Sequence, residues 1–166
     1  MSSRRDWLLA GAVVGMGLVA GLFYGFACGV MPGLANADDR TLIDAMQQIN
    51  ESIENPVFFL TYLGAPVLAA WVLVLDWRSG SHTAVRWLIA ALVLYGVAFV
   101  VTGSLNIPLN DDLAQAGDPR RIGDLAAVRD DYEDPWIAWN IVRTVFHTAA
   151  FGALIPALTA RRRLAP

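Results

Sequence analysis

Residues 136–147 (WIAWNIVRTVFH) open the last hydrophobic segment of the chain, and they decide how the rest is interpreted. Asn140, Arg143 and His147 recur at steps of three and four residues. On a helix these steps place the three polar side chains on one face, along about two turns. An arginine this deep in a membrane span normally faces a bundle interior or a wet cavity. The remaining sequence should therefore supply other helices for this face to meet.

Composition predicts an integral membrane protein. The chain has 166 residues, of which 56% are hydrophobic, and it contains no lysine. Soluble domains of this size rarely carry so many apolar residues. Four runs are long enough to cross a hydrocarbon core, which takes about 20 helical residues. The first run is longer than a signal-peptide core of about 7–15 residues, so it counts as a span. We expect an all-α, four-transmembrane-helix bundle in a single domain (1–166), with spans at about 7–31, 56–75, 87–105 and 136–160.

The distribution of charge predicts the orientation. Arginines flank the first span at its start, the second connection, and the end of the fourth span, whereas the other two connections are acidic. By the positive-inside rule, both termini are cytoplasmic and the protein lies in the cell inner (plasma) membrane. The net charge of −3 describes two faces of opposite sign, so it indicates no nucleic-acid partner. The arginines in question are Arg4, Arg5, Arg78, Arg86, Arg161, Arg162 and Arg163.

The two acidic connections each predict an amphipathic surface helix. Asn36 or Asp38 can cap the first, in which Leu42, Met46 and further apolar residues share one face. Asp118 and Pro119 can start the second, which we expect to end near Asp131 before Asp134–Pro135 turns the chain into the last span. Pro108 is expected to break the helix of the third span. Both surface helices would roof the bundle on its extracytoplasmic side.

The first span carries a glycine at every fourth position, at Gly17, Gly21, Gly25 and Gly29. Such a flat helix face allows close approach of a neighbouring backbone, either inside the bundle or in a homo-oligomer. It can also line a slot for a planar ligand.

Several kinds of chemistry find no support in the sequence. It has no Walker loop, no GxGxxG opening a βαβ unit, no CxxC and no HExxH. The two histidines lie on opposite sides of the predicted topology, which argues against a histidine-rich metal or haem site. No carboxylate lies in the centre of a span, and Cys28 is a single cysteine. We therefore expect no metal and no cofactor.

Polar and aromatic residues instead gather in the outer half of the third and fourth spans. Arg143 and His147 are the candidate catalytic residues. Arg143 lies about 10 Å below Trp136 at 1.5 Å per residue. It can reach outward to Asp111, Asp112 or Asp134 in a purely structural role, or serve as a fixed cation for a carbonyl, phenolate or enolate. His147 is either a packing residue or a general base. The candidate substrate-binding residues are Asn106, Asn110, Trp136, Trp139 and Asn140.

Five short motifs occur in order along the chain: Val30-Met31-Pro32-Gly33-Leu34, Met46-Gln47-x-x-Asn50, Asn55-Pro56-x-Phe58, Asn106-x-Pro108-Leu109-Asn110 and Trp136-x-x-Trp139-Asn140-x-x-Arg143-Thr144. In these motifs the chain resembles the DUF1772, or anthrone oxygenase-like, membrane family. The resemblance implies a four-helix membrane bundle. For some fungal members it also implies oxidation of a tricyclic anthrone to an anthraquinone by O2, without a known metal or flavin.

The resemblance extends to particular positions. Asn106, Asn110, Trp139, Asn140 and Arg143 match the family's pattern, whereas His147 departs from it, so no role is carried over to His147. The arginine-rich, lysine-free composition indicates a bacterial chain.

Two functions stay open at this point, and a third, a small transport subunit, is disfavoured because no carboxylate lies in the centre of a span. One is a membrane protein with an outer-leaflet pocket for a lipophilic, aromatic or quinone-like small molecule, acting as a cofactor-independent oxidoreductase of the anthrone oxygenase type, a monooxygenase. The alternative is a non-catalytic membrane protein that binds such a molecule or supports a partner. In both, the partners are the lipid bilayer and a lipophilic small molecule.

Overall fold

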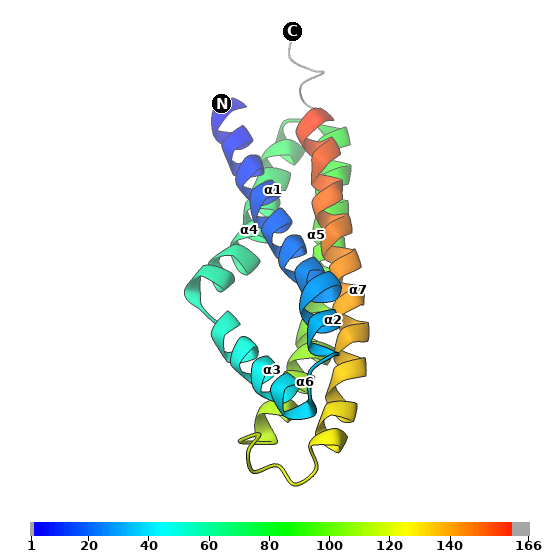
Figure 1. The fold of residues 1–166 in the computed structure, drawn as a ribbon. Helices are drawn as coiled ribbons and strands as arrows, with labels where there is room; N and C mark the ends of the chain where they lie inside the picture. The colour runs from blue at the N-terminus through cyan, green and yellow to red at the C-terminus, as the bar shows by residue number, and fades with distance from the viewer. Residues whose placement is uncertain (1, 161–166) are drawn as a thin grey trace.

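The computed structural model describes residues 2–160, with side chains from residue 4 onward, and it is all-helical over that range (Figure 1). Four helical stretches are long and apolar enough to cross a membrane, which confirms the predicted four-helix membrane bundle. They run over Arg4–Leu34, Pro56–Arg78, His82–Gln115 and Leu125–Ala160. Arg161, Arg162 and Arg163, on which part of the predicted orientation rests, lie outside the described residues. The orientation and the choice of membrane stay predictions.

The first and third stretches each contain a wider turn just before a proline. α1 (Ser2–Gly25) passes through the π-helical turn η1 (Phe26–Val30) into α2 (Met31–Leu34). α5 (His82–Val101) passes through the π-helical turn η2 (Thr102–Asn106) into α6 (Ile107–Gln115). Pro32 and Pro108 thus lie at the start of a new helical segment, where a missing N–H needs no partner within that segment. The prediction that Pro108 breaks the helix is therefore wrong.

Side-chain caps fix the helices between these stretches. Asp38 precedes α3 (Asp39–Ile53), and its carboxylate accepts a hydrogen bond from the Thr41 backbone N–H at 3.1 Å. Asn55 precedes α4 (Pro56–Arg78), and its Oδ1 accepts from the backbone N–H of Val57 and Phe58. Both are standard N-cap arrangements, and Pro56 at the first helical position supports the second. The first surface helix is thus present as α3.

The second surface helix, predicted from Asp118 to about Asp131, does not form as a separate element. α7 (Leu125–Ala160) begins in the acidic connection and runs through Pro135 into the last span. Tyr132 and Trp136, on either side of Pro135, are buried in the same cluster, so one apolar face continues across the proline. Asp118 makes a turn instead, because its side chain accepts a hydrogen bond from the Arg120 backbone N–H.

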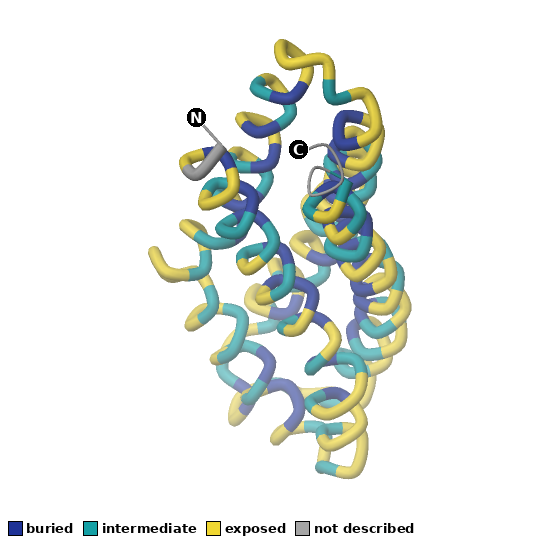
Figure 2. The backbone as a smooth tube through the Cα atoms, turned by 90° about the horizontal axis from the view of Figure 1, so that it is seen from above, coloured by how far each residue is buried: buried dark blue, intermediate teal, exposed yellow. Residues whose placement is uncertain are grey.

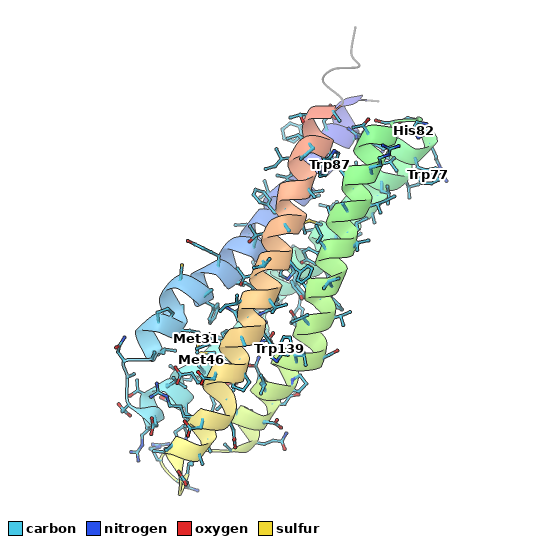
Figure 3. The ribbon with its side chains drawn as sticks, turned by 90° about the vertical axis from the view of Figure 1, so that its right-hand side faces the viewer. Met31, Met46, Trp77, His82, Trp87 and Trp139 are labelled. Carbon is cyan, nitrogen blue, oxygen red and sulfur yellow. The ribbon has the colours of Figure 1, made fainter. Side chains whose placement is uncertain are left out.

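The helices pack antiparallel, α1 against α4 and α7, and α5 against α4 and α7. The start of α1, the end of α7 and the α4–α5 connection lie together, at what we call the terminal end (Figure 1). Trp77, His82 and Trp87 lie at this end (Figure 3). The 36 residues of α7 span about 54 Å at 1.5 Å per residue, well beyond a hydrocarbon layer of about 30 Å. At the opposite end, α3, α6 and residues 125–135 form what we call the cap.

The interior consists of two hydrophobic clusters. The bundle core lies among α1, α4, α5 and α7, and seven of its sixteen buried residues are alanine. The cap core has no alanine among its buried residues and consists of larger side chains, including Met31 of α2 and Met46 of α3, which lie close together (Figure 3). Buried positions follow the helix faces that point toward one another (Figure 2). Outward-facing Val14, Leu60 and Val100 are exposed in a manner suited to lipid.

Only part of the glycine series in α1 meets a neighbouring helix. A Cβ on Gly15 would lie 2.7 Å from Cβ of Ala65 on α4, and a Cβ on Gly17 would lie 3.1 Å from the Phe151 ring on α7. Gly21, Gly25 and Gly29 have no atom of the described chain within 4 Å of such a Cβ. Close packing therefore uses Gly15 and Gly17, together with Gly11, where a Cβ would lie 3.2 Å from Leu68 Cδ1. The homo-oligomer predicted for the glycine face stays a prediction.

Candidate functional site

A pocket of about 180 Å³ lies where the bundle core meets the cap core, and we call it the seam pocket. Phe23 and Tyr62 reach it from the bundle core, and Phe26 and Trp136 from the cap core. Six of its fourteen lining residues are aromatic, which suits a flat apolar ligand. Five polar lining residues come from five different elements, and Glu54 directly follows α3; the six are Asn50, Glu54, Tyr62, Thr102, Asn110 and Arg143.

The predicted polar face of α7 is buried as expected. Trp136, Asn140, Arg143 and His147 are all buried, at steps of four, three and four residues. Because these steps keep side chains on one side of a helix, the face meets α1 and α5 instead of lipid. The sequence-based placement of these residues on one inward face is confirmed.

Arg143 is the buried charged group in the lining of the seam pocket, whereas Glu54 is exposed. Its side chain is only 5% exposed, and its Nε donates to Asn140 Oδ1 at 3.0 Å. The guanidinium carbon lies 4.2 Å from the ring centroid of Phe23 and 5.0 Å from that of Trp136. Arg143 forms no salt bridge within the described part of the chain, so the outward pairing with Asp111, Asp112 or Asp134 is not made. Two aromatic faces and one amide oxygen are what stabilise the cation.

Asn140 positions Arg143 and does not line the pocket itself. Its Nδ2 donates to the Phe23 carbonyl oxygen at 3.3 Å, while its Oδ1 accepts from Arg143. Thr144 donates from its hydroxyl to the Asn140 carbonyl at 2.6 Å. The amide thereby holds the guanidinium against α1.

A second amide network closes the cap side of the pocket. Asn110 Oδ1 accepts from Trp136 Nε1 at 2.8 Å and from the Tyr132 hydroxyl at 3.2 Å, and Asn50 Nδ2 donates to that hydroxyl at 3.4 Å. These bonds join α3, α6 and α7. Asn106 is fully buried, donates to the Trp136 carbonyl at 3.4 Å, and has no hydrogen-bond partner for its Oδ1 among the described residues.

Trp139 is not part of the pocket lining. Its side chain is 37% exposed, in contrast to the 2% of Trp136. It lies on α7, as labelled in Figure 3. The structure therefore separates the two tryptophans that the sequence motif joins.

His147 is buried behind the pocket and does not line it. Its ring stacks on Phe23 with centroids 5.0 Å apart, and it meets Tyr95 edge-on at 4.6 Å. Neither ring nitrogen has a hydrogen-bond partner in residues 4–160. Its role as a base stays a prediction, and the Phe23 and Tyr62 rings line the pocket in its place.

Sequence reasoning missed most of the aromatic lining. Phe23, Phe26 and Tyr62 belong to spans that looked uniformly apolar, so no local pattern distinguished them. Phe58 and Asn50 stood inside quoted motifs without being assigned a role. The spacing of Phe58 and Tyr62, one turn apart below the Asn55 cap, is the signal that could have identified this face of α4.

The described residues contain no group of three or more His, Cys, Asp or Glu side chains arranged to hold a metal ion. The polar groups of the seam pocket are mainly amides, hydroxyls and one guanidinium. These groups bind oxygen atoms of an organic ligand more readily than they bind a cation.

Comparison with known proteins identifies the family. The family model for anthrone oxygenase matches residues 57–153, from the first turn of α4 to the second half of α7. The matched range includes Tyr62, Asn106, Asn110, Trp136 and Arg143, whereas Phe23 and α3 precede it. No curated protein and no solved structure matches the chain. Because the match covers more than half of this multi-pass membrane protein, the chain belongs to the anthrone oxygenase family.

Proposed function

We propose that the seam pocket binds a planar lipophilic aromatic molecule and places a carbonyl or phenolate oxygen of that molecule on Arg143. One observation carries the proposal: a buried guanidinium lines an aromatic pocket without a carboxylate partner in residues 4–160.

A cation removed from water is strongly destabilising unless a negative charge or several acceptors replace the lost hydration. In the described residues Arg143 has one hydrogen bond, from Nε, and no hydrogen bond from either Nη atom. Those two nitrogens are the donors left for a ligand. An oxyanion with a fixed guanidinium in a place of low dielectric is the arrangement that stabilises charge most effectively.

The shape and size of the pocket favour a flat ring system. An apolar cavity of about 150 Å³ holds a benzene molecule, so about 180 Å³ accommodates a somewhat larger aromatic group. A tricyclic molecule would extend toward the mouth at α3. There, Asn50, Glu54 and Asn110 also line a neighbouring pocket of about 420 Å³ on the acidic face of the cap. The outer part of a ligand would thus meet polar groups.

We extend the proposal to oxidation by O2, which the family supports. An anthrone loses a proton from its methylene carbon, and the resulting anion carries its charge largely on the ketone oxygen. Arg143 would stabilise that oxyanion, and Glu54, the one carboxylate in the pocket lining, would accept the proton. The anion then reacts with O2: the carbon loses its second hydrogen and gains one oxygen atom, while the other oxygen atom leaves as water.

The test is O2 uptake by the detergent-purified protein given a hydroxylated anthrone, with spontaneous autoxidation subtracted. The Arg143→Met variant replaces the arginine by an apolar side chain of similar length and so removes the charge. We expect its protein-dependent rate to fall at least about tenfold, which corresponds to about 1.4 kcal/mol. Arg86→Met, which removes an exposed arginine at the terminal end, is the matched control and should leave the rate unchanged. No rate above autoxidation from folded wild-type protein would refute the oxygenase reaction.

The second candidate is binding without turnover. The position of His147 favours it, because this buried histidine lies outside the pocket lining and the other candidate base, Glu54, is exposed. In that case a hydroxylated anthraquinone would quench the fluorescence of Trp136 and raise the unfolding temperature, while O2 uptake would stay at background.

A further inference from the structure

Two neighbouring tyrosines in the bundle core differ in how their hydroxyls are satisfied. Tyr62 on α4 and Tyr95 on α5 are both buried, with ring centroids 5.8 Å apart. The Tyr95 hydroxyl donates to the Tyr62 carbonyl oxygen at 2.6 Å. The Tyr62 hydroxyl has no hydrogen bond of acceptable geometry to any described residue. Thr102 lies close to it without forming such a bond, and the Thr102 hydroxyl donates to the Ala98 carbonyl.

The Tyr62 ring is held firmly in place. It stacks on Phe58 with centroids 5.1 Å apart and on Phe99 at 5.7 Å, and it meets Phe23 edge-on at 6.3 Å. Because neighbours on three helices define the ring, its hydroxyl cannot swing out to water without disturbing the core.

A buried hydroxyl without a partner is uncommon in native structures and calls for an explanation. The Tyr62 side chain is 5% exposed and lines the seam pocket together with Arg143. The O–H of a buried ring that lines a pocket and cannot turn is satisfied most directly by an acceptor atom of a ligand.

We propose that Tyr62 donates a hydrogen bond to an oxygen of the bound molecule and acts beside Arg143 as a second donor. The pocket would then select an aromatic ketone, or the enolate derived from it, over a hydrocarbon of the same shape. This inference rests on the proposed binding function of the seam pocket and is independent of whether the ligand is oxidised.

The experiment compares two probes on purified protein in detergent. One is a dihydroxyanthraquinone, and the other is anthracene, which has the same ring frame and no oxygen. Dissociation constants come from the quenching of tryptophan fluorescence. In Tyr62→Phe we expect the quinone to bind about threefold to tenfold more weakly, as for one lost hydrogen bond, and anthracene to bind as it does to the wild type.

Tyr95→Phe is the matched control, since it removes a neighbouring hydroxyl whose bond lies within the protein. It should lower the unfolding temperature and leave the quinone affinity unchanged, whereas Tyr62→Phe should leave the unfolding temperature unchanged or raise it.

An equal loss of affinity for both probes, or unchanged quinone binding in Tyr62→Phe, would overturn the inference. If Arg143→Met weakens quinone binding while Tyr62→Phe does not, the proposed function survives and the role of Tyr62 fails. If folded wild-type protein binds no quinone, both fail together.

Discussion

The two ends of the bundle each bury an arginine, and they treat it in opposite ways. At the terminal end, Arg5 of α1 is 4% exposed and its guanidinium binds the fully buried Asp76 carboxylate of α4 through two nitrogens. At the cap end, Arg143 is equally buried and has no carboxylate partner among residues 4–160. A paired charge is complete within the protein and joins two helices. A buried cation beside a pocket without a carboxylate partner is stabilised by acceptor atoms of a ligand, which is why we place the ligand there.

The two ends also differ in the size of the side chains that pack in their cores. The bundle core is rich in alanine and brings α1 close to α4 at Gly15 and Ala65. The cap core is made of large side chains, and the seam pocket lies at the junction of the two cores. Close packing of small residues leaves little room, whereas mismatched large rings leave a space between them. The terminal half should therefore govern stability, and the junction should govern binding.

Breaking the Arg5–Asp76 pair should have the largest effect on stability. Asp76→Ala leaves the Arg5 cation buried without its counter-ion, which costs about 3–5 kcal/mol in comparable buried pairs. The measurement is the free energy of unfolding in detergent micelles. The double variant Arg5→Met/Asp76→Leu, which removes both charges, should recover most of the loss. If Asp76→Ala and Arg143→Met are equally destabilising, the distinction between the two arginines is wrong.

Crowding the α1–α4 contact should have the next largest effect. An alanine at Gly15 would place its Cβ 2.7 Å from that of Ala65, so the helices must separate. Overpacking of this kind costs about 1–3 kcal/mol. Gly21→Ala is the matched substitution with open space around it, and it should be neutral or stabilise the helix by up to about 1 kcal/mol. Equal unfolding temperatures for the two variants would refute this description of the contact.

A smaller effect should separate the two tryptophans of α7. Trp136→Phe removes the indole N–H that donates to Asn110 and opens space in the cap core, so we expect a loss of about 1–2 kcal/mol together with weaker ligand binding. Trp139→Phe changes a side chain outside the pocket lining and should alter stability by no more than about 0.5 kcal/mol. Unfolding and quinone binding measured on both variants give the comparison, which fails if Trp139→Phe is the more harmful for binding.

The sequence predicted the fold well because membrane spans and N-caps are local signals. The four spans follow from apolar length, and α3 follows from Asp38 and the apolar face that begins at Leu42. The prediction of a separate second surface helix was wrong because Pro135 was expected to form a turn. Here α7 continues through Pro135 because Tyr132 and Trp136, on either side of it, pack in one cluster with residues of α3 and α6. Such contacts between distant segments cannot be seen in the sequence.

The candidate site could be predicted only on the helix that carries its polar face. The spacing of Asn140, Arg143 and His147 predicted that all three point inward, but it did not predict that only Arg143 lines the pocket. Nothing in the sequence distinguished Trp136 from Trp139. Residues three apart lie on nearly the same face of a helix, so their spacing does not tell which of the two side chains is buried. Tyr62 was missed because a hydroxyl without a partner is visible only in three dimensions.

Acid should loosen the cap before it affects the bundle core, and this is the smallest effect we expect. The hydroxyl and backbone N–H of Thr41 donate to the Asp38 carboxylate and hold the pKa of Asp38 below its usual 3.8. Since the folded pKa is the lower one, the stabilisation is complete above about pH 4 and is lost as the pH falls through the folded pKa.

The measurement is hydrogen exchange of the α3 amides relative to those of α5, corrected for the intrinsic effect of pH on exchange. In the wild type, protection of the first turn of α3 should fall as the pH drops below about 4, while that of α5 should hold. Asp38→Asn keeps an N-cap acceptor that does not titrate in this range, so its α3 should lose less protection in acid. Asp39, which pairs with Arg129, is present in both proteins, so the difference between them isolates Asp38. Identical acid sensitivity in the two proteins would mean that the first turn of α3 is stabilised by the Asp39–Arg129 pair and by its apolar face, without a contribution from the Asp38 carboxylate.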